Sequence, residues 1–268
     1  MSLATCMTSC QNRIALVTGS TQGIGLAIAK TLASQGARLI LNGLETPTQA
    51  NAILREFKCA YGQEPVYIAC DLSDSDQIAA MMSTIDRDFG RLDILVNNAG
   101  IQHVSSIKDF SPEIWEQMLA TNLSASFHTM RTGIPLMEKN DWGRIVNIAS
   151  ISGLRGRAGK AGYNATKHGL IGLTKSVALE LAASNITCNA ICPGWVHTTL
   201  VQQQIDKLAE SRQLDNDTAT RQLLEARQPS GRFVTADQIA DLVLFLCSPS
   251  ASEVRGVAWA MDGGTTAQ

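Results

Sequence analysis

The sequence predicts an α/β fold in which a doubly wound parallel sheet of about seven strands carries helices on both faces. Short apolar runs alternate with amphipathic helical segments along the chain, and a glycine-rich turn joins the first run to the first helix. Of the 268 residues, 45% are hydrophobic but only 5% are aromatic, which suits helices packed over a buried sheet. A chain of this length can bury one sizeable core.

The composition argues against several classes of function. The net charge is −2 and no basic run occurs, so nucleic acid is not an expected partner. No apolar stretch reaches the ~18 residues of a membrane span, and the N-terminus lacks a signal-peptide pattern. The seven cysteines are odd in number and show no paired zinc-ligand spacing. We therefore expect reduced thiols, no metal site and a cytoplasmic location.

The first strand and helix flank a glycine turn. Residues 1–12 resemble a loose tail, residues 13–17 form the strand, and a helical pattern continues to Gly36. Between them, Gly19 permits the turn, Gly23 allows close backbone approach, and Gly25 allows tight helix packing. A strand, a glycine turn and a helix together form a cradle for phosphate groups, although glycines also favour a plain strand-to-helix turn.

The second strand, residues 38–42, ends in Gly43-Leu44-Glu45. An acidic residue at this strand end would bind the ribose hydroxyls of NAD, and an arginine would bind the 2′-phosphate of NADP. Gly43 occupies the expected acidic position, and no cation stands nearby in the sequence. The missing cation favours NAD over NADP.

The next two strands end in polar residues. Helical patterns over residues 47–61 and 75–89 separate strands at 66–70 and 92–96, which lead into Asp71 and into Asn97-Asn98-Ala99-Gly100. Two adjacent asparagines are costly at a strand end unless their amides are used. Ligands of open α/β sheets bind at this edge, so we expect these residues to face one.

The helical segment from Pro112 to Met137 contains Asn122, and its last part, from Met118, is strongly periodic. Asparagine is a poor residue for a helix interior. Its amide therefore either faces solvent or bends the helix and holds a water molecule.

The central stretch runs from a strand at residues 144–148 to a helix that opens near Ala161. Tyr163 and Lys167 are four residues apart, so they share one face of that helix. An ammonium beside a phenol lowers a pKa that is normally ~10. Ser150 can direct a hydroxyl at the same spot, so the three groups could move a proton on and off a carbinol oxygen. A surface tyrosine and lysine on an ordinary helix are the alternative.

The C-terminal third contains an insertion. A strand at residues 187–192 leads through Pro193-Gly194 to two predicted helices, residues 200–211 and 216–227, and a helix at 236–247 and a strand at 257–261 close the sheet.

These motifs, in this order, resemble the classical short-chain dehydrogenases/reductases over residues 13–264. The resemblance implies a Rossmann-type single catalytic domain, residues 13–268, behind the flexible tail 1–12, with a helical substrate lid at about 199–228 and a homotetramer of 222 symmetry. It implies that Tyr163 is the general acid/base, that Lys167 lowers its pKa, that Ser150 binds the substrate oxygen, and that Asn122 holds a water in the proton path. The residues that it assigns to NAD are Gly19, Thr21, Gln22, Gly23, Ile24, Gly25, Asp71, Leu72, Asn98, Gly100, Tyr163, Lys167, Pro193, Val196 and Thr198.

Within that family, residues 98–104, 190–196 and 200–205 resemble those of bacterial D-3-hydroxybutyrate dehydrogenases. That similarity implies a carboxylate held by Gln102, Lys160 and Gln204, next to Ser150 and Tyr163. Two positions depart from the pattern: Ser152 replaces a histidine and Thr265 replaces a tryptophan, which would leave a roomier and more polar pocket. Arg155 and Arg157 add positive charge beside Lys160, unless they belong to a solvated loop.

The sequence thus predicts an NAD-dependent dehydrogenase of a small anionic hydroxy acid, with 3-hydroxybutyrate as the nearest analogue. A dehydrogenase of a sugar, a sugar acid or another polar secondary alcohol is the alternative in the same class. A non-catalytic nucleotide-binding protein is the alternative from another class.

Overall fold

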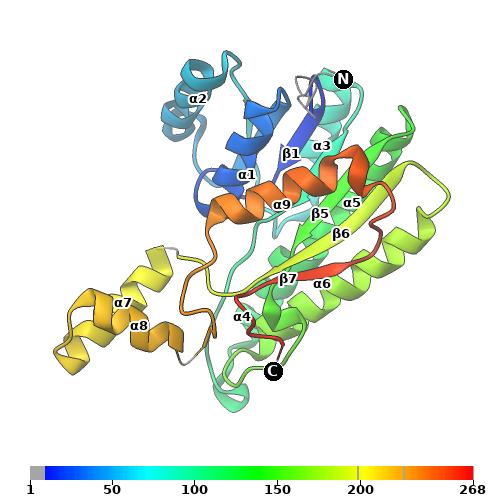
Figure 1. Cartoon of the computed structure of the whole chain (residues 1–268). Coiled ribbons are helices and arrows are strands. Elements are labelled where there is room, and N and C mark those ends of the chain that lie inside the picture. Colours follow the sequence, from blue (N-terminus) through cyan, green and yellow to red (C-terminus); the bar gives the residue numbers. More distant parts are fainter. Residues whose placement is uncertain (1–9, 198, 226, 268) are drawn as a thin grey trace, which may run out of the picture.

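In the part of the chain that this computed structural model describes, residues 10–197, 199–225 and 227–267, seven parallel strands form one sheet (Figure 1). The side chains of Thr199, Leu200, Gln203 and Gln204 are not described. In the sheet order β3-β2-β1-β4-β5-β6-β7, the strands are Val66–Ala69, Arg38–Gly43, Ile14–Val17, Ile94–Asn97, Gly143–Ile148, Ile186–Pro193 and Ala258–Met261. The predicted doubly wound sheet is confirmed, and every strand end lies within two residues of its expected position.

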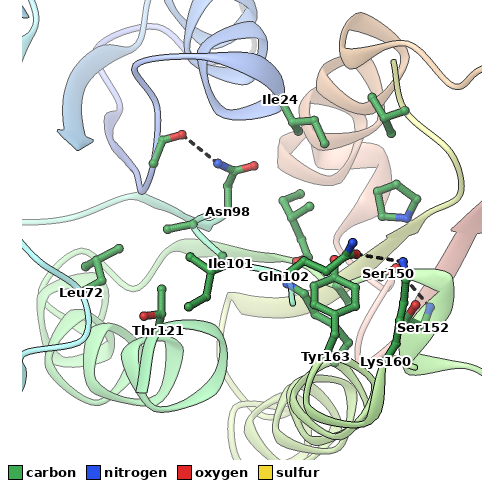
Figure 2. A pocket seen from close by; sticks show the side chains of 18 of the residues that line it. Ile24, Leu72, Asn98, Ile101, Gln102, Thr121, Ser150, Ser152, Lys160 and Tyr163 are labelled. Carbon is green, nitrogen blue, oxygen red and sulfur yellow. Dashed lines mark hydrogen bonds between the residues drawn. The ribbon is translucent and has the colours of Figure 1, made fainter. Parts of the chain in front are cut away.

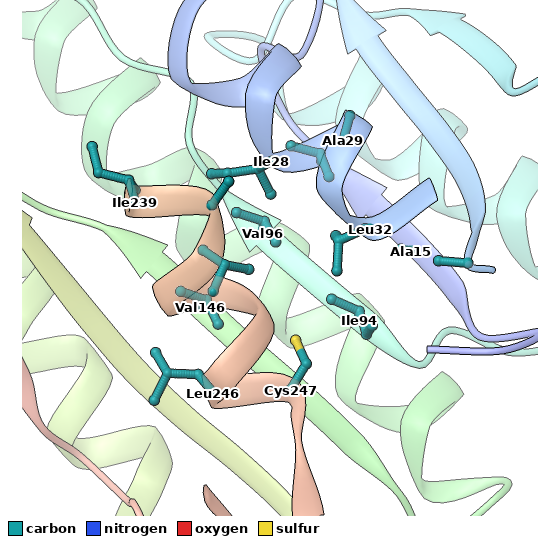
Figure 3. Packing of buried hydrophobic residues seen from close by; sticks show 14 of the residues in the cluster. Ala15, Ile28, Ala29, Leu32, Ile94, Val96, Val146, Ile239, Leu246 and Cys247 are labelled. Carbon is teal, nitrogen blue, oxygen red and sulfur yellow. The ribbon is translucent and has the colours of Figure 1, made fainter. Parts of the chain in front are cut away.

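Alternating side chains on the central strands divide the core into two layers. In β1, Val17 belongs to the cluster under α1 (Gly23–Ser34) and α9 (Ala236–Cys247), whereas its neighbour Leu16 belongs to the cluster on the other face. Val96 and Leu95 of β4 repeat this division, as successive residues of a strand must. Figure 3 shows the first layer, where Val96 lies against side chains of both helices. Burial on both faces explains why these strands are continuous apolar runs.

The opposite face is covered by α3 (Ser75–Phe89), α5 (Ala125–Glu138) and α6 (Ala161–Glu180), while α2 (Pro47–Tyr61) packs on the first face through Phe57. Local signals set the ends of these helices. Thr46 forms a capping box with Gln49, and α2 ends at Gly62 in the left-handed conformation. Asp74 caps α3, which ends in the same way at Gly90.

The long helical segment expected around Asn122 is interrupted. Helix α4 (Pro112–Leu119) passes into a π-helical turn, Ala120–Ser124, before α5 begins. Asn122 lies in this turn and is 1% exposed, so the solvent-facing alternative is wrong. Turns of 3-10 type cover Ile107–Asp109, Ile151–Gly153 and Pro249–Ala251.

The insertion forms the two expected helices, α7 (Thr199–Arg212) and α8 (Asn216–Glu225), which lie beside the main body of the molecule (Figure 1). They share a small apolar cluster of their own that contains Val201, Ile205 and Leu223. Trp195, from the segment after β6, packs against this cluster and so connects the two helices to the sheet.

Candidate active site

A cavity of about 930 Å³ lies at the carboxyl ends of the central strands. The sheet order reverses between β1 and β4, and ligands of open α/β sheets bind at that point. The cavity runs from the glycine turn, past Asn98 and Ile101, to Ser150 and Tyr163 at the other end (Figure 2). Its volume is at the upper end of the ~300–1,000 Å³ that is usual for ligand pockets, as expected of a site for two molecules.

The glycine turn fits a dinucleotide phosphate. Gly19 and Gly23 have φ angles of +58° and +57°, which side chains rarely adopt, and nothing lies within 4 Å of a Cβ built at Gly23. A methyl group on Gly25 would collide with the Gly19 carbonyl and with the Asn98 amide. Gln22 makes no side-chain cap on α1, so the first amides of the helix are left for an anion.

Two asparagines hold this turn in place. The Asn98 amide donates to the carbonyls of Thr18 and Gly19 at 2.9 and 3.0 Å. Asn42 accepts a hydrogen bond from the Gly19 N–H at 3.2 Å and donates to the carbonyls of Ile68 and Cys70. Asn98, expected on the adenosine side, therefore lines the cavity while it braces the phosphate turn.

The sequence interpretation missed one carboxylate. Glu45 folds back over Gly43, so that a Cβ at Gly43 would collide with the Glu45 carboxylate. Thr21 donates to that carboxylate at 2.8 Å, and Tyr67 donates to the Glu45 carbonyl at 2.7 Å and to the carboxylate at 3.3 Å. Burial, with the negative charge of Glu45, raises the pKa of Tyr67 to about 12. The acidic group absent from position 43 is thus supplied from two residues downstream.

Most of the expected cofactor residues border the cavity. Those on its wall are Gly19, Thr21, Gln22, Ile24, Asp71, Leu72, Asn98, Gly100, Tyr163, Lys167, Pro193 and Val196. Gly23 and Gly25 shape the turn without lining the cavity, and Thr198 lies outside the described residues.

Tyr163, Ser150 and Lys167 meet at one end of the cavity. The Ser150 hydroxyl lies next to the Tyr163 phenol and favours its charged form. The Lys167 ammonium lies 5.6 Å from the centre of the Tyr163 ring and donates to the Ile148 carbonyl at 2.8 Å. The strand end and the helix face thus bring together the three groups that the spacing singled out.

The expected lowering of the Tyr163 pKa is not found. Burial raises the pKa of the phenol, and only the neighbouring Ser150 hydroxyl opposes that shift. Burial also lowers the pKa of Lys167 to about 8, so the ammonium is itself destabilised where it lies. Tyr163 is therefore held as a neutral phenol, which is the form that donates a proton.

Asn122 does not line the cavity itself but is hydrogen-bonded to Ile101, which does. Its side-chain oxygen accepts from the Ile101 N–H, and its amide donates to the Ile101 carbonyl, both at 2.8 Å. The π-helical turn directs this amide at the loop after β4. That loop carries Gln102, so Asn122 helps to fix the substrate end of the site.

Gln102 and Lys160, both expected to hold a substrate carboxylate, are hydrogen-bonded to each other. Lys160 donates to the Gln102 side-chain oxygen at 3.0 Å (Figure 2). The two loops that carry them are joined by a parallel bridge between Ser105 and Lys160 and by a backbone bond from Ser105 to Gly159. Burial, and repulsion from Arg157 and Arg227, lower the pKa of Lys160 to about 8. The side chain of Gln204 lies outside what the structure describes.

The two departures from the hydroxybutyrate dehydrogenase pattern differ in their consequences. Ser152 lines the cavity, as expected. Thr265 does not: it is 1% exposed, and its hydroxyl donates to the Asp262 and Arg227 carbonyls at 2.6 and 3.2 Å.

The sequence comparisons agree with this geometry. Residues 19–266 match a family model described as enoyl-(acyl carrier protein) reductase. A D-beta-hydroxybutyrate dehydrogenase of Cupriavidus necator is 49% identical over 256 residues, which cover 96% of this chain and 98% of the relative. The enzyme of the same description from Rhizobium meliloti is 45% identical and covers 96% and 99%. The chain is a short-chain dehydrogenase/reductase.

A solved member of this short-chain dehydrogenase/reductase family has the same fold. The L-sorbose reductase of Gluconobacter frateurii, in complex with NADPH and L-sorbose, superposes with a TM-score of 0.92 at 28% identity. The match covers 98% of this chain and 100% of the reductase.

Among the described residues, no group of three or more His, Cys, Asp or Glu side chains could hold a metal ion. No helix in that part of the chain is long and apolar enough to cross a membrane.

Proposed function

We propose that this oxidoreductase is an NAD-dependent dehydrogenase of a small anionic hydroxy acid related to 3-hydroxybutyrate. The observation that carries the proposal is the Lys160–Gln102 pair beside the Ser150–Tyr163 pair on one cavity wall. The first pair offers an ammonium and an amide to a carboxylate, and the second offers hydroxyl groups to a carbinol oxygen. Two relatives at 45% and 49% identity carry the description D-beta-hydroxybutyrate dehydrogenase.

The residues divide the chemistry as follows. A bound nicotinamide would supply the hydride acceptor for oxidation and the hydride donor for reduction. In the oxidation direction the phenolate form of Tyr163, reached once its own proton has left to solvent, takes the proton of the carbinol, while Ser150 holds its oxygen. In the reduction direction Tyr163 returns the proton to the carbonyl oxygen, and its raised pKa keeps it protonated for that step. Lys167 would hold the cofactor ribose next to these groups.

The preference for NAD is supported by Glu45. Its carboxylate lies over the end of β2, where the adenosine ribose of a dinucleotide is bound in this type of fold. A carboxylate can accept hydrogen bonds from two ribose hydroxyls but repels a 2′-phosphate.

A second candidate is a polar secondary alcohol such as a sugar or sugar acid. Ser152 favours it, because this small polar side chain lines the cavity. The fold is also shared with a reductase crystallised with L-sorbose. The Lys160–Gln102 pair favours the acid.

The test is a panel of hydroxy acids and sugars, assayed with NAD and with NADP by the absorbance of the reduced nicotinamide. We expect the highest kcat/KM for a 3-hydroxy acid with NAD. Tyr163→Phe removes the phenol at the reacting oxygen, so kcat should fall by about 10³-fold while NADH still binds. Turnover of sugars alone would select the second candidate, and a Tyr163→Phe variant with most of its activity would contradict the assigned acid/base.

We further propose a homotetramer in the cytoplasm. Phe127 on α5 and Leu179 on α6 are 45% and 78% exposed, and the resemblance to the family implies that the helices around Asn122 and Tyr163 pair between subunits. The described cysteines Cys59, Cys70, Cys188, Cys192 and Cys247 are free thiols, which suits a reducing compartment.

A further inference from the structure

The substrate end of the cavity holds more positive charge than one carboxylate needs. Besides Lys160, the side chains of Arg155, Arg157 and Arg227 line it. Among the described residues, no carboxylate lies within 4.0 Å of any of these four cations. Arg157 is partly buried on this wall, whereas Arg155 lines the cavity but is exposed, so the solvated-loop alternative is wrong for Arg157 and describes Arg155 in part.

The arginines are held in place by neutral groups. The guanidinium carbons of Arg157 and Arg227 lie 5.4 and 4.6 Å from the centre of the Trp195 ring, so one indole supports both cations. Arg155 donates to the Thr265 carbonyl at 2.9 Å, and the Thr265 hydroxyl donates to the Arg227 carbonyl. Thr265, buried beside the cavity, thus ties together the segments that carry two of the arginines.

Such an arrangement costs free energy while the cavity is without an anion. Burial, and then repulsion from Arg155, lowers the pKa of Arg157, and burial, with repulsion from Arg157, lowers the pKa of Arg227. Four like charges around one cavity are stabilised when an anion enters between them. Arginine is also the side chain that holds carboxylate or phosphate through two parallel hydrogen bonds.

We propose that the natural substrate is a hydroxy acid with a second anionic group, a carboxylate or a phosphate, which Arg155, Arg157 and Arg227 bind. The proposal rests on the proposed function, since it takes the first carboxylate to lie at Lys160 and Gln102. The phosphates of a dinucleotide do not account for these arginines, because the glycine turn and the start of α1 provide for them in another part of the cavity.

The test uses unreactive acids, so that it does not depend on turnover. Binding of butyrate, glutarate, adipate and 3-phosphonopropionate to the NADH-loaded enzyme is measured by calorimetry at constant ionic strength. Glutarate and adipate place a second carboxylate at two distances, and the phosphonate represents the phosphate arm. We expect at least one dianion to bind about fivefold or more tighter than butyrate, because of the added charge-assisted bonds.

The variants Arg157→Gln and Arg227→Gln should reduce that advantage below about fivefold, with Arg221→Gln as the matched control. Arg221 is an exposed arginine of α8 that does not line the cavity. No dianion with such an advantage in the wild-type enzyme, or an advantage kept by both variants, would overturn the proposal. Turnover of 3-hydroxybutyrate and 3-hydroxyglutarate is assayed separately. If the enzyme oxidises 3-hydroxybutyrate at least as well as 3-hydroxyglutarate and binds all the unreactive acids alike, the proposed function stands and only the second anionic group is ruled out.

Discussion

At the scale of single residues, cofactor choice depends on one carboxylate. Glu45 is fixed by Thr21 and Tyr67 at the end of β2. Glu45→Gln keeps the shape and removes the charge, so the repulsion of a 2′-phosphate disappears. We expect the ratio of kcat/KM for NADP to that for NAD to rise about tenfold, the equivalent of about 1.4 kcal/mol.

The control for this prediction is Glu64→Gln, which neutralises an exposed carboxylate away from the cavity. It should leave the ratio unchanged. If Glu45→Gln also leaves the ratio unchanged, Glu45 does not select the cofactor.

A second residue-scale prediction concerns pH. The pKa of Lys160 is lowered to about 8, so its ammonium is present below that pH and is lost as the pH rises through it. The kcat/KM for 3-hydroxybutyrate should therefore fall above pH ~8, because the carboxylate loses its cation. Lys160→Arg keeps the charge and should move this fall to higher pH.

Lys167 also has a pKa lowered to about 8, so the two lysines must be separated. A neutral secondary alcohol such as 2-butanol has no carboxylate for Lys160 to bind. Any fall in its kcat/KM above pH ~8 therefore comes from other groups of the site, such as Lys167. Gln102, Lys160 and Gln204, the residues expected to hold the substrate carboxylate, are here called the carboxylate clamp. If the pH profile with the acid is the same in the wild type and in Lys160→Arg, Lys160 does not belong to this clamp.

The residues that sequence alone could assign stand at fixed spacing on regular elements. Tyr163 and Lys167 share a helix face, and Ser150 follows a strand that ends beside that helix. Glu45 could not be assigned, because its side chain turns back over a glycine in a loop whose path no periodicity sets. Arg227 could not be assigned either, because it reaches Arg157 only through Trp195, far away in the sequence.

At the scale of elements, the two helices of the insertion are the part of the site with the smallest share of the core. They pack mainly on each other, through Val201, Ile205 and Leu223. Of the glutamines in α7, Gln202 is already engaged, since it lies 2.8 Å from His197 and donates to Asp206 at 2.8 Å. From the resemblance to the hydroxybutyrate dehydrogenases, we propose that Gln204 completes the carboxylate clamp when these helices close over the substrate.

Gln204→Ala should raise KM for the acid substrate by about tenfold, since a charge-assisted bond contributes roughly 1.5–3 kcal/mol. The Kd for NADH, measured by fluorescence, should stay nearly unchanged, because no residue of α7 is among those assigned to the cofactor. Gln202→Ala, two positions earlier on the same helix, is the matched control and should leave KM near the wild-type value. Equal effects of the two variants would show that α7 acts only as a cover.

At the scale of the whole molecule, the sheet could be predicted because its central strands are buried on both faces. The apolar runs of β1, β4, β5 and β6 therefore stand out in the sequence. The π-helical turn at Asn122 could not be predicted, because its apolar periodicity resembles that of a continuous helix. The structure explains the asparagine there by its two bonds to the backbone of Ile101.

The last prediction concerns assembly. Phe127 and Leu179 expose large apolar side chains on α5 and α6, two helices of one face of the sheet. In a tetramer of 222 symmetry each such face meets its own copy across a two-fold axis, so one substitution acts twice at every contact. Leu179→Arg should place two like charges in an apolar interface, and light scattering at micromolar concentration should then show dimers or monomers instead of tetramers. Val66→Arg, on edge strand β3, is the control for added charge and should remain tetrameric. A wild-type protein that scatters as a stable monomer would contradict the proposed assembly before any variant is made.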